Sequence, residues 1–289
     1  MTVVFVDTVH PILSQRLKER NFKCIHLENE SEEACKKALK TADGLVIRSR
    51  FPIDKEFLNQ TPKLKFIARS GAGLENIDLE ECENKNVQVY NSPEGNRNAV
   101  GEHCLGMLLS ILNKMHVGHN EVCQSIWRRE ENRGEELDGK TVGIIGFGNN
   151  GSAFAKKLRG FDVKVLAYDK YKTGYGDHFV IESTLESIFE NADVISFHIP
   201  QNKETHYFFN DAFVDFCKKP FYLLNASRGK IVQLSALQKA IDEKKVLAAG
   251  LDVLEIESSS FENFENSDQN KTFQKLIDSN KVLFTPHVA

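Results

Sequence analysis

A glycine-rich turn between an apolar strand and a helix constrains the fold of this 289-residue chain more than any other feature of its sequence. Gly146, Gly148 and Gly151 follow the β-branched run 142–145 and precede a stretch, 152–158, with helical spacing of its apolar residues. In a Gly-x-Gly-x-x-Gly turn the first glycine permits a tight bend and the second lets a pyrophosphate approach the backbone. The third lets the helix pack closely on the strand. With the N–H groups of the helix start facing the phosphates, the pattern predicts a dinucleotide-binding domain.

An acidic residue after the next strand-like run, 163–168, indicates which dinucleotide is bound. Asp169 lies 23 residues after Gly146, near the spacing at which a carboxylate binds the adenosine ribose hydroxyls. Its charge would repel a 2′-phosphate, so the sequence predicts NAD rather than NADP, although Lys170 and Lys172 keep NADP open. The alternative for Asp169 is an ordinary turn residue at the end of a strand.

Short β-branched runs alternate with amphipathic stretches along the whole chain. Strands that alternate with helices in this way predict parallel α/β units. We therefore expect an α/β protein of two parallel-sheet domains, the first over residues 1–96 and the second over residues 97–285. Apolar residues at helical spacing predict one long helix over residues 100–115 with Asn98 as its N-cap, and the polar stretch 257–271 is expected to be a loop.

The composition excludes several classes of protein and partner. Lysine plus arginine number 37 and aspartate plus glutamate 41, so the formal net charge of −4 gives no footprint for nucleic acid or an anionic membrane. No apolar run approaches the roughly 18 residues that span a membrane, and the first residues lack the basic leader of a signal peptide. The six cysteines show no metal-binding spacing, so we expect reduced thiols, no metal site and a cytoplasmic location.

Three segments in the last third of the chain place polar side chains directly after strand-like runs. Arg228 follows one run, Asp252 and two glutamates follow the next, and His287 follows the last. Ligands of open α/β sheets bind at the carboxyl ends of the strands, and a guanidinium suits a carboxylate ligand. A histidine held by a carboxylate near such an arginine suits acid/base work in alcohol oxidation. The alternative is structural, since a lone histidine or a surface arginine is more often so.

Seven segments, in the same order, resemble the D-isomer-specific 2-hydroxyacid dehydrogenase family along nearly the whole chain. Each segment alone is common, but seven in order are highly specific. The resemblance implies a flavodoxin-like substrate-binding domain followed by a Rossmann NAD-binding domain. The segments are residues 67–78, 91–96 with 100–103, 146–151, 192–200, 225–229, 250–253 and 285–287.

The resemblance also implies roles, position by position. Arg228 would anchor and polarise the substrate, His287 would be the acid/base, and Glu257, rather than Glu255, would orient the histidine. Hydride would pass between C2 of a 2-hydroxy or 2-oxo acid and the nicotinamide of NAD. Asn150 departs from the family's pattern, which has an aliphatic residue there. Besides the glycines and Asp169, the implied cofactor contacts are Asn149, Asn150, Ile199, Ala226 and Asp252, and the implied substrate contacts are the backbone N–H groups of Ser70, Gly71, Ala72 and Gly73.

Basic residues bear on the choice of substrate. Arg48 and Arg69 match positions where the phosphoglycerate dehydrogenase branch carries basic side chains, and Arg129 is a third match. Cations there suit a substrate phosphate, so D-3-phosphoglycerate dehydrogenase is the preferred interpretation and glyoxylate or hydroxypyruvate reductase the alternative. A non-catalytic NAD-sensing or corepressor-like binding protein is the hypothesis from another class.

The resemblance further implies an assembly and a longer chain. The family is usually dimeric, and the apolar face of residues 100–115 fits a homodimer, with burial inside one subunit as the alternative. In the family the chain returns after the histidine to complete the first domain with a helix. Residues 286–289 would begin that crossing, so we expect that 289 is not a natural length and that the return segment is missing after Ala289.

Overall fold

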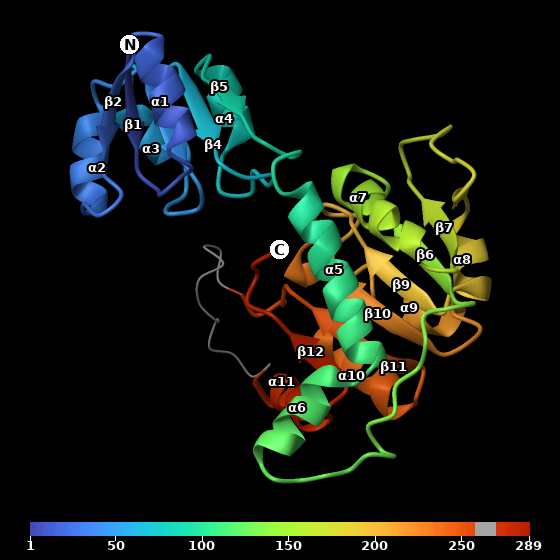
Figure 1. The fold of residues 1–289 in the computed structure, drawn as a ribbon. Helices are drawn as coiled ribbons and strands as arrows, with labels where there is room; N and C mark the ends of the chain where they lie inside the picture. Colours follow the sequence, from blue (N-terminus) through green and yellow to red (C-terminus); the bar gives the residue numbers. More distant parts are fainter. Residues whose placement is uncertain (258–269) are drawn as a thin grey trace. The chain divides into compact units, whose positions relative to one another are not determined.

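The structure is a computed structural model that describes residues 1–257 and 270–289 (Figure 1). The chain forms two compact units, the first over Met1–Asn96 and the second beginning at Arg97. Every strand pair in the described ranges is parallel, so the expected α/β class with two parallel sheets is confirmed.

The first unit is a five-stranded sheet in the order β2-β1-β3-β4-β5, which is the flavodoxin order. Neighbouring residues of β1 enter different cores, Val4 on one face and Val3 and Phe5 on the other, so both faces of the sheet are covered. The strands are β1 (Thr2–Phe5), β2 (Lys23–His26), β3 (Gly44–Ile47), β4 (Phe66–Arg69) and β5 (Gln88–Tyr90), and the helices are α1 (Ile12–Glu19), α2 (Glu32–Leu39), α3 (Lys55–Gln60) and α4 (Leu79–Asn84).

The second unit is a seven-stranded sheet in the order β12-β11-β10-β9-β6-β7-β8. Read from β8, this is the Rossmann order with one further strand, and the order reverses between β6 and β9, where ligands of such sheets bind. The strands are β6 (Thr141–Ile145), β7 (Lys164–Tyr168), β8 (Val180–Glu182), β9 (Val194–Phe197), β10 (Phe221–Asn225), β11 (Val246–Leu251) and β12 (Val282–Phe284).

Helices cover both faces of this second sheet (Figure 1). One core lies under α5 and α7 and takes Tyr222 and Leu224 of β10, whereas the other lies under α8 to α11 and takes Leu223. A Cβ at Gly101 would lie 3.0 Å from the backbone of Ala153, so this glycine lets α5 and α7 pack closely. The helices are α5 (Arg97–Leu112), α6 (Met115–Cys123), α7 (Asn149–Lys157), α8 (Leu185–Asn191), α9 (Asp211–Phe216), α10 (Leu234–Asp242) and α11 (Asn270–Asp278), with short 3-10 turns at Leu158–Gly160 and Gly229–Ile231.

The prediction of one helix over residues 100–115 is wrong in its extent. The helix ends at Leu112 and a second begins at Met115, because Lys114 between them has a left-handed φ of 50° that interrupts the hydrogen-bond ladder. Asn98 is not the N-cap: the helix already begins at Arg97, and the Asn98 amide donates to Glu102.

The structure also bears on the cysteines, on the expected loop 257–271, and on membrane and metal binding. Four of the six cysteines are buried and all six are free thiols, and burial raises the pKa of Cys104 and Cys217 to about 12. Most of the expected loop 257–271 lies outside the described residues, although its last two residues begin α11. In the described ranges no helix is both long and apolar enough to cross a bilayer, and no cluster of His, Cys, Asp and Glu could hold a metal ion.

A histidine just after β9 predicts a pH-dependent stability. The Nε2 of His198 is 2.8 Å from the Ser196 hydroxyl, its ring packs on Phe154, and burial lowers its pKa to about 4. The unfolded chain, with an ordinary histidine, then binds more protons than the folded chain between about pH 6.5 and pH 4. Stability from this group is therefore full above pH 6.5 and falls as the pH drops through this window, by about 2 kcal/mol between pH 7 and pH 5. Urea unfolding of wild type and His198→Asn at both pH values tests this, and equal losses in the two proteins would contradict it.

Candidate dinucleotide site and catalytic cluster

The glycine turn joins β6 to α7 with no room for side chains at two of its three glycines. Gly146 has a φ of 93°, and a Cβ there would lie 2.5 Å from the carbonyl oxygen of His198. A Cβ at Gly151 would lie 2.0 Å from the carbonyl oxygen of Gly146, so only glycine lets the helix approach the turn. Gly148, in contrast, faces open space and precedes the first helical residue, Asn149. The backbone at the helix start is therefore exposed to an approaching phosphate.

Asp169 ties the end of β7 to this turn. One carboxylate oxygen accepts the Phe147 N–H at 2.8 Å, and the other accepts the N–H groups of Tyr171 and Lys172. The neighbouring Lys170 forms an ion pair with Glu204, which raises the pKa of the Lys170 ammonium. The carboxylate thus stands at the strand end where a ribose would bind, and the cation beside it is already paired with an acid.

Three other predicted cofactor residues lie around the same edge of the sheet. Ile199 follows β9, and its Cγ2 would lie 2.9 Å from a Cβ at Gly146. Ala226 follows β10. In the first turn of α7 the Oδ1 of Asn150 is buried and accepts no hydrogen bond from the described residues. The strand ends and the turn therefore offer backbone donors and one carboxylate acceptor, which fits a dinucleotide.

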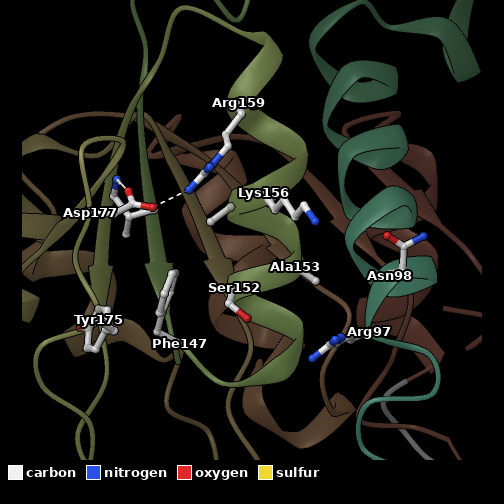
Figure 2. Close-up of a pocket in the computed structure, with 11 residues that line it drawn as sticks. Arg97, Asn98, Phe147, Ser152, Ala153, Lys156, Arg159, Tyr175 and Asp177 are labelled. Carbon is white, nitrogen blue, oxygen red and sulfur yellow. Dashed lines mark hydrogen bonds and ion pairs between the residues drawn. The ribbon is translucent and has the colours of Figure 1, made fainter.

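A cavity of about 480 Å³ lies along the flank of α7 and contains none of the residues predicted to bind cofactor or substrate. Figure 2 shows Ser152 and Lys156 of α7 between Arg97 on one side and Tyr175 and Asp177 on the other. Asp177 forms an ion pair with Arg159. We therefore treat this cavity as separate from the dinucleotide site.

A buried amide shapes the turn that carries Arg228. The side chain of Asn225, at the end of β10, accepts from the N–H and the hydroxyl of Ser227 and donates to the carbonyl oxygen of Arg228 at 3.0 Å. A Cβ at Gly229 would lie 1.9 Å from the carbonyl oxygen of Leu254. The turn after β10 is thus pressed against the loop after β11, which carries the two candidate glutamates.

The two glutamates of that loop have different partners. Glu257 places one carboxylate oxygen 2.7 Å from Nδ1 of His287, and the other accepts the N–H of Leu254. Glu255 is buried, and its Oε1 accepts the N–H of Leu234 at the start of α10. The histidine–carboxylate pair of the second unit is therefore formed by Glu257 and His287, whose side chains are 11% and 21% exposed.

Asp252 anchors the segment that carries His287. Its carboxylate is 1% exposed and accepts from the Thr285 hydroxyl at 2.6 Å and from the N–H groups of Val288 and Ala289. Its carbonyl oxygen accepts the His287 N–H at 2.8 Å, and His287 has a left-handed φ of 51°. One residue after β11 therefore fixes the conformation of the last five residues.

Sequence reasoning gave no role to one residue of this cluster. The Nε2 of His103, on α5, is 2.9 Å from Thr285 Oγ1 and 3.4 Å from Asp252 Oδ1. His103 lies in the segment 100–103 that supports the family resemblance. Its partner Thr285 is 182 residues away in the sequence, so the local pattern around His103 could not predict this contact.

In the first unit the turn after β4 offers fewer free donors than expected. Ser70 donates its N–H to Ile47 and Gly71 donates its N–H to Arg69, so these two groups are not open to a substrate carboxylate. Of the four predicted N–H groups, those of Ala72 and Gly73 donate no hydrogen bond to another described residue. The prediction that all four N–H groups bind the carboxylate is therefore wrong for Ser70 and Gly71.

Two glycine substitutions separate folding from cofactor binding. Gly151→Ala adds a methyl group against backbone, so we expect a loss of about 1–3 kcal/mol in the free energy of unfolding. Gly148→Ala adds one into open space, so we expect stability to change by less than about 1 kcal/mol while NADH binds at least about tenfold more weakly. Urea unfolding and NADH fluorescence titration measure the two effects, and unchanged NADH affinity in Gly148→Ala would contradict this placement of the pyrophosphate.

Comparisons with known proteins agree with this geometry. Residues 105–289 match the sequence model described as D-isomer specific 2-hydroxyacid dehydrogenase, NAD binding domain. The chain is 33% identical over 252 residues to D-3-phosphoglycerate dehydrogenase of Bacillus subtilis, covering 86% of this chain but 46% of that protein, so it spans about half of that relative's length. It is 32% identical over 265 residues to hydroxypyruvate reductase of Thermotoga maritima, covering 91% of this chain and 82% of that protein.

A solved structure gives the same result for the whole described fold. The D-lactate dehydrogenase of Aquifex aeolicus, complexed with NAD and lactic acid, matches with a TM-score of 0.82 at 28% identity, covering 100% of this chain and 88% of that one. The family and the cofactor predicted from the sequence are confirmed. The chain belongs to the D-isomer-specific 2-hydroxyacid dehydrogenase family, and its second unit contains that family's NAD-binding domain.

Proposed function

We propose that this chain is an NAD-dependent dehydrogenase that interconverts a D-2-hydroxy acid and its 2-oxo acid. The observation that carries the proposal is the Glu257–His287 pair, held at the carboxyl edge of the NAD-binding sheet. The turn that bears Arg228 packs against the same loop as Glu257 through Gly229. An acid/base group, its orienting carboxylate and a carboxylate-binding cation are the groups that this oxidation needs.

Each side chain has a distinct task in the reaction. Arg228 binds the substrate carboxylate and polarises the C2 oxygen. His287 takes the hydroxyl proton during oxidation at Nε2, the ring nitrogen opposite the one that Glu257 holds, and returns it during reduction. Bound NAD supplies the nicotinamide that exchanges hydride with C2.

We assign the cofactor to the residues around the glycine turn. Gly146, Gly148, Asn149, Asn150 and Gly151 would bind the pyrophosphate. Asp169 would bind the adenosine ribose and Asp252 the nicotinamide carboxamide, while Ile199 and Ala226 would pack against the dinucleotide. The pairing of Lys170 with Glu204 supports NAD over NADP, because that ammonium is not left to bind a 2′-phosphate.

The first unit, Met1–Asn96, is proposed to bind the substrate, with Ala72 and Gly73 donating to its carboxylate. We propose a phosphorylated substrate such as 3-phosphoglycerate. The exposed Arg48, whose N–H is held by Asp7 at 2.6 Å, and Arg69 at the end of β4 support a phosphate in the first unit. Hydroxypyruvate is the second candidate, since the chain covers most of the hydroxypyruvate reductase that it resembles.

Oxidation of NADH by a panel of 2-oxo acids, followed by absorbance, tests the activity. The panel includes hydroxypyruvate, glyoxylate and 3-phosphohydroxypyruvate, and we expect the highest kcat/KM for the phosphorylated acid. If NADH binds but no acid is reduced, the enzyme proposal fails and the non-catalytic NAD-binding hypothesis is supported. A preference for hydroxypyruvate would support the second candidate.

The neighbouring glutamates provide a matched pair of variants for the same assay. Glu257→Gln removes the charge that orients His287, so we expect kcat/KM to fall by about 10²-fold or more. Glu255→Gln changes a carboxylate that contacts the start of α10, so kcat/KM should stay near the wild-type value. Equal losses in both variants would argue against the assignment of Glu257.

We also propose a homodimer, formed by a different surface from the one expected. The apolar residues of α5 are buried inside the second unit, so that face is not available to a partner. Exposed apolar side chains instead follow on α6 and just beyond it: Met115, Val122, Ile126 and Trp127, the last 80% exposed. Four exposed apolar side chains within one short segment favour an association surface there.

Trp127→Ser therefore should shift the full chain from dimer to monomer in sedimentation velocity at micromolar concentration. Tyr171→Ser, which removes a 76% exposed aromatic ring elsewhere on the second unit, is the matched control and should remain dimeric. A monomeric wild type, or a dimeric Trp127→Ser protein, would contradict the proposed surface.

A further inference from the structure

Three polar side chains from separate elements meet at the carboxyl end of β11. His103 comes from α5, Thr285 follows β12, and Asp252 follows β11. The Nε2 of His103 is 2.9 Å from Thr285 Oγ1, and that hydroxyl is 2.6 Å from Asp252 Oδ1. The Asp252 carboxylate is almost fully buried, whereas the His103 side chain is 24% exposed. A chain of hydrogen bonds therefore leads from the partly exposed His103 side chain, through Thr285, to the buried carboxylate of Asp252.

The chemistry of the three groups gives this chain a direction. An ionised carboxylate only accepts, so the short contact requires that the Thr285 hydroxyl donates to Asp252. A hydroxyl has one proton, so Thr285 Oγ1 can only accept from His103, and the imidazole must carry its proton on Nε2. The other acceptor near the hydroxyl is the weak Met107 sulfur at 3.9 Å, which does not compete with a carboxylate.

The two oxygens of Asp252 are then used unequally. Oδ1 accepts from Thr285 and from the Val288 N–H, and it also lies 3.4 Å from His103 Nε2. Within the described chain, Oδ2 accepts one hydrogen bond, from the Ala289 N–H at 3.0 Å. A carboxylate oxygen can accept two, so Oδ2 keeps capacity for a further donor.

We propose that His103 is a positioning residue for the nicotinamide end of the cofactor. Through Thr285 it holds Oδ1 of Asp252, so that the carboxylate keeps one orientation and presents Oδ2 to the carboxamide N–H. This inference rests on the proposed role of Asp252 and names the residues that orient it. Because the carbonyl oxygen of Asp252 also accepts the His287 N–H, the same network connects the carboxamide site to the acid/base histidine.

ADP-ribose, which lacks the nicotinamide, separates this role from a purely structural one. In the full chain, His103→Leu and Thr285→Val each break the hydrogen-bond chain. We expect each to weaken NADH binding about tenfold, the effect of about 1.4 kcal/mol, while the Kd for ADP-ribose stays within about twofold. The double variant should bind NADH no more weakly than either single variant, because both remove the same chain. His103→Gln, whose amide N–H can replace the imidazole donor, should restore most of the NADH affinity.

Two results would overturn the proposal. One is unchanged NADH affinity in both His103→Leu and Thr285→Val, and the other is equal weakening of NADH and ADP-ribose, which marks a structural role alone. His119→Gln on α6 is the matched control and should alter neither constant.

Asp252→Asn distinguishes failure of this inference from failure of the assignment beneath it. If Asp252→Asn weakens NADH selectively but His103→Leu does not, only the positioning role is wrong. If Asp252→Asn leaves both dissociation constants unchanged, the nicotinamide assignment of Asp252 and the positioning role fail together. Neither result depends on turnover of a substrate.

Discussion

The buried carboxylate of Asp252 fixes the last residues of the chain to the sheet, and the geometry of the candidate site depends on it. A charge that is 1% exposed is tolerated inside a protein only where hydrogen bonds replace its water. The replacing donors, on Thr285, Val288 and Ala289, all belong to the segment that carries His287. The bonds that satisfy the charge therefore also place the imidazole and hold its left-handed backbone.

The parallel topology explains why so many of these groups gather at one edge. All strands of the second sheet point the same way, so the residues after β6, β9, β10 and β11 emerge side by side. Close backbone contacts then hold the emerging loops together: the His198 carbonyl lies against Gly146, and the Leu254 carbonyl lies against Gly229. At these positions the absence of a side chain is what brings one functional loop against the next.

Patterns local in sequence could be predicted, whereas contacts that depend on the tertiary fold could not. The strand–turn–helix around Gly146 and the parallel α/β class follow from residue spacing, and both are confirmed. The choice of Glu257 rather than Glu255 as the partner of His287 came from the family resemblance. The spacing of the residues alone does not favour one of these two glutamates over the other.

The break at Lys114 was missed because hydrophobic periodicity carries no information about a single left-handed φ. The N–H groups of Ser70 and Gly71 were misjudged because their acceptors belong to the fold and not to the turn. His103 was missed for the same reason, since its partner lies on another element.

The left-handed residue between α5 and α6 divides one apolar pattern into two helices under unequal constraint. Upstream of Lys114, seven residues of α5 are buried and His103 contacts the candidate site. Substitutions in α5 therefore disturb the packing of the core or the site. Downstream, α6 has no buried residue at all. Substitutions in α6 therefore disturb the core less than substitutions in α5, so the proposed association surface can vary without altering the residues proposed to hold the cofactor.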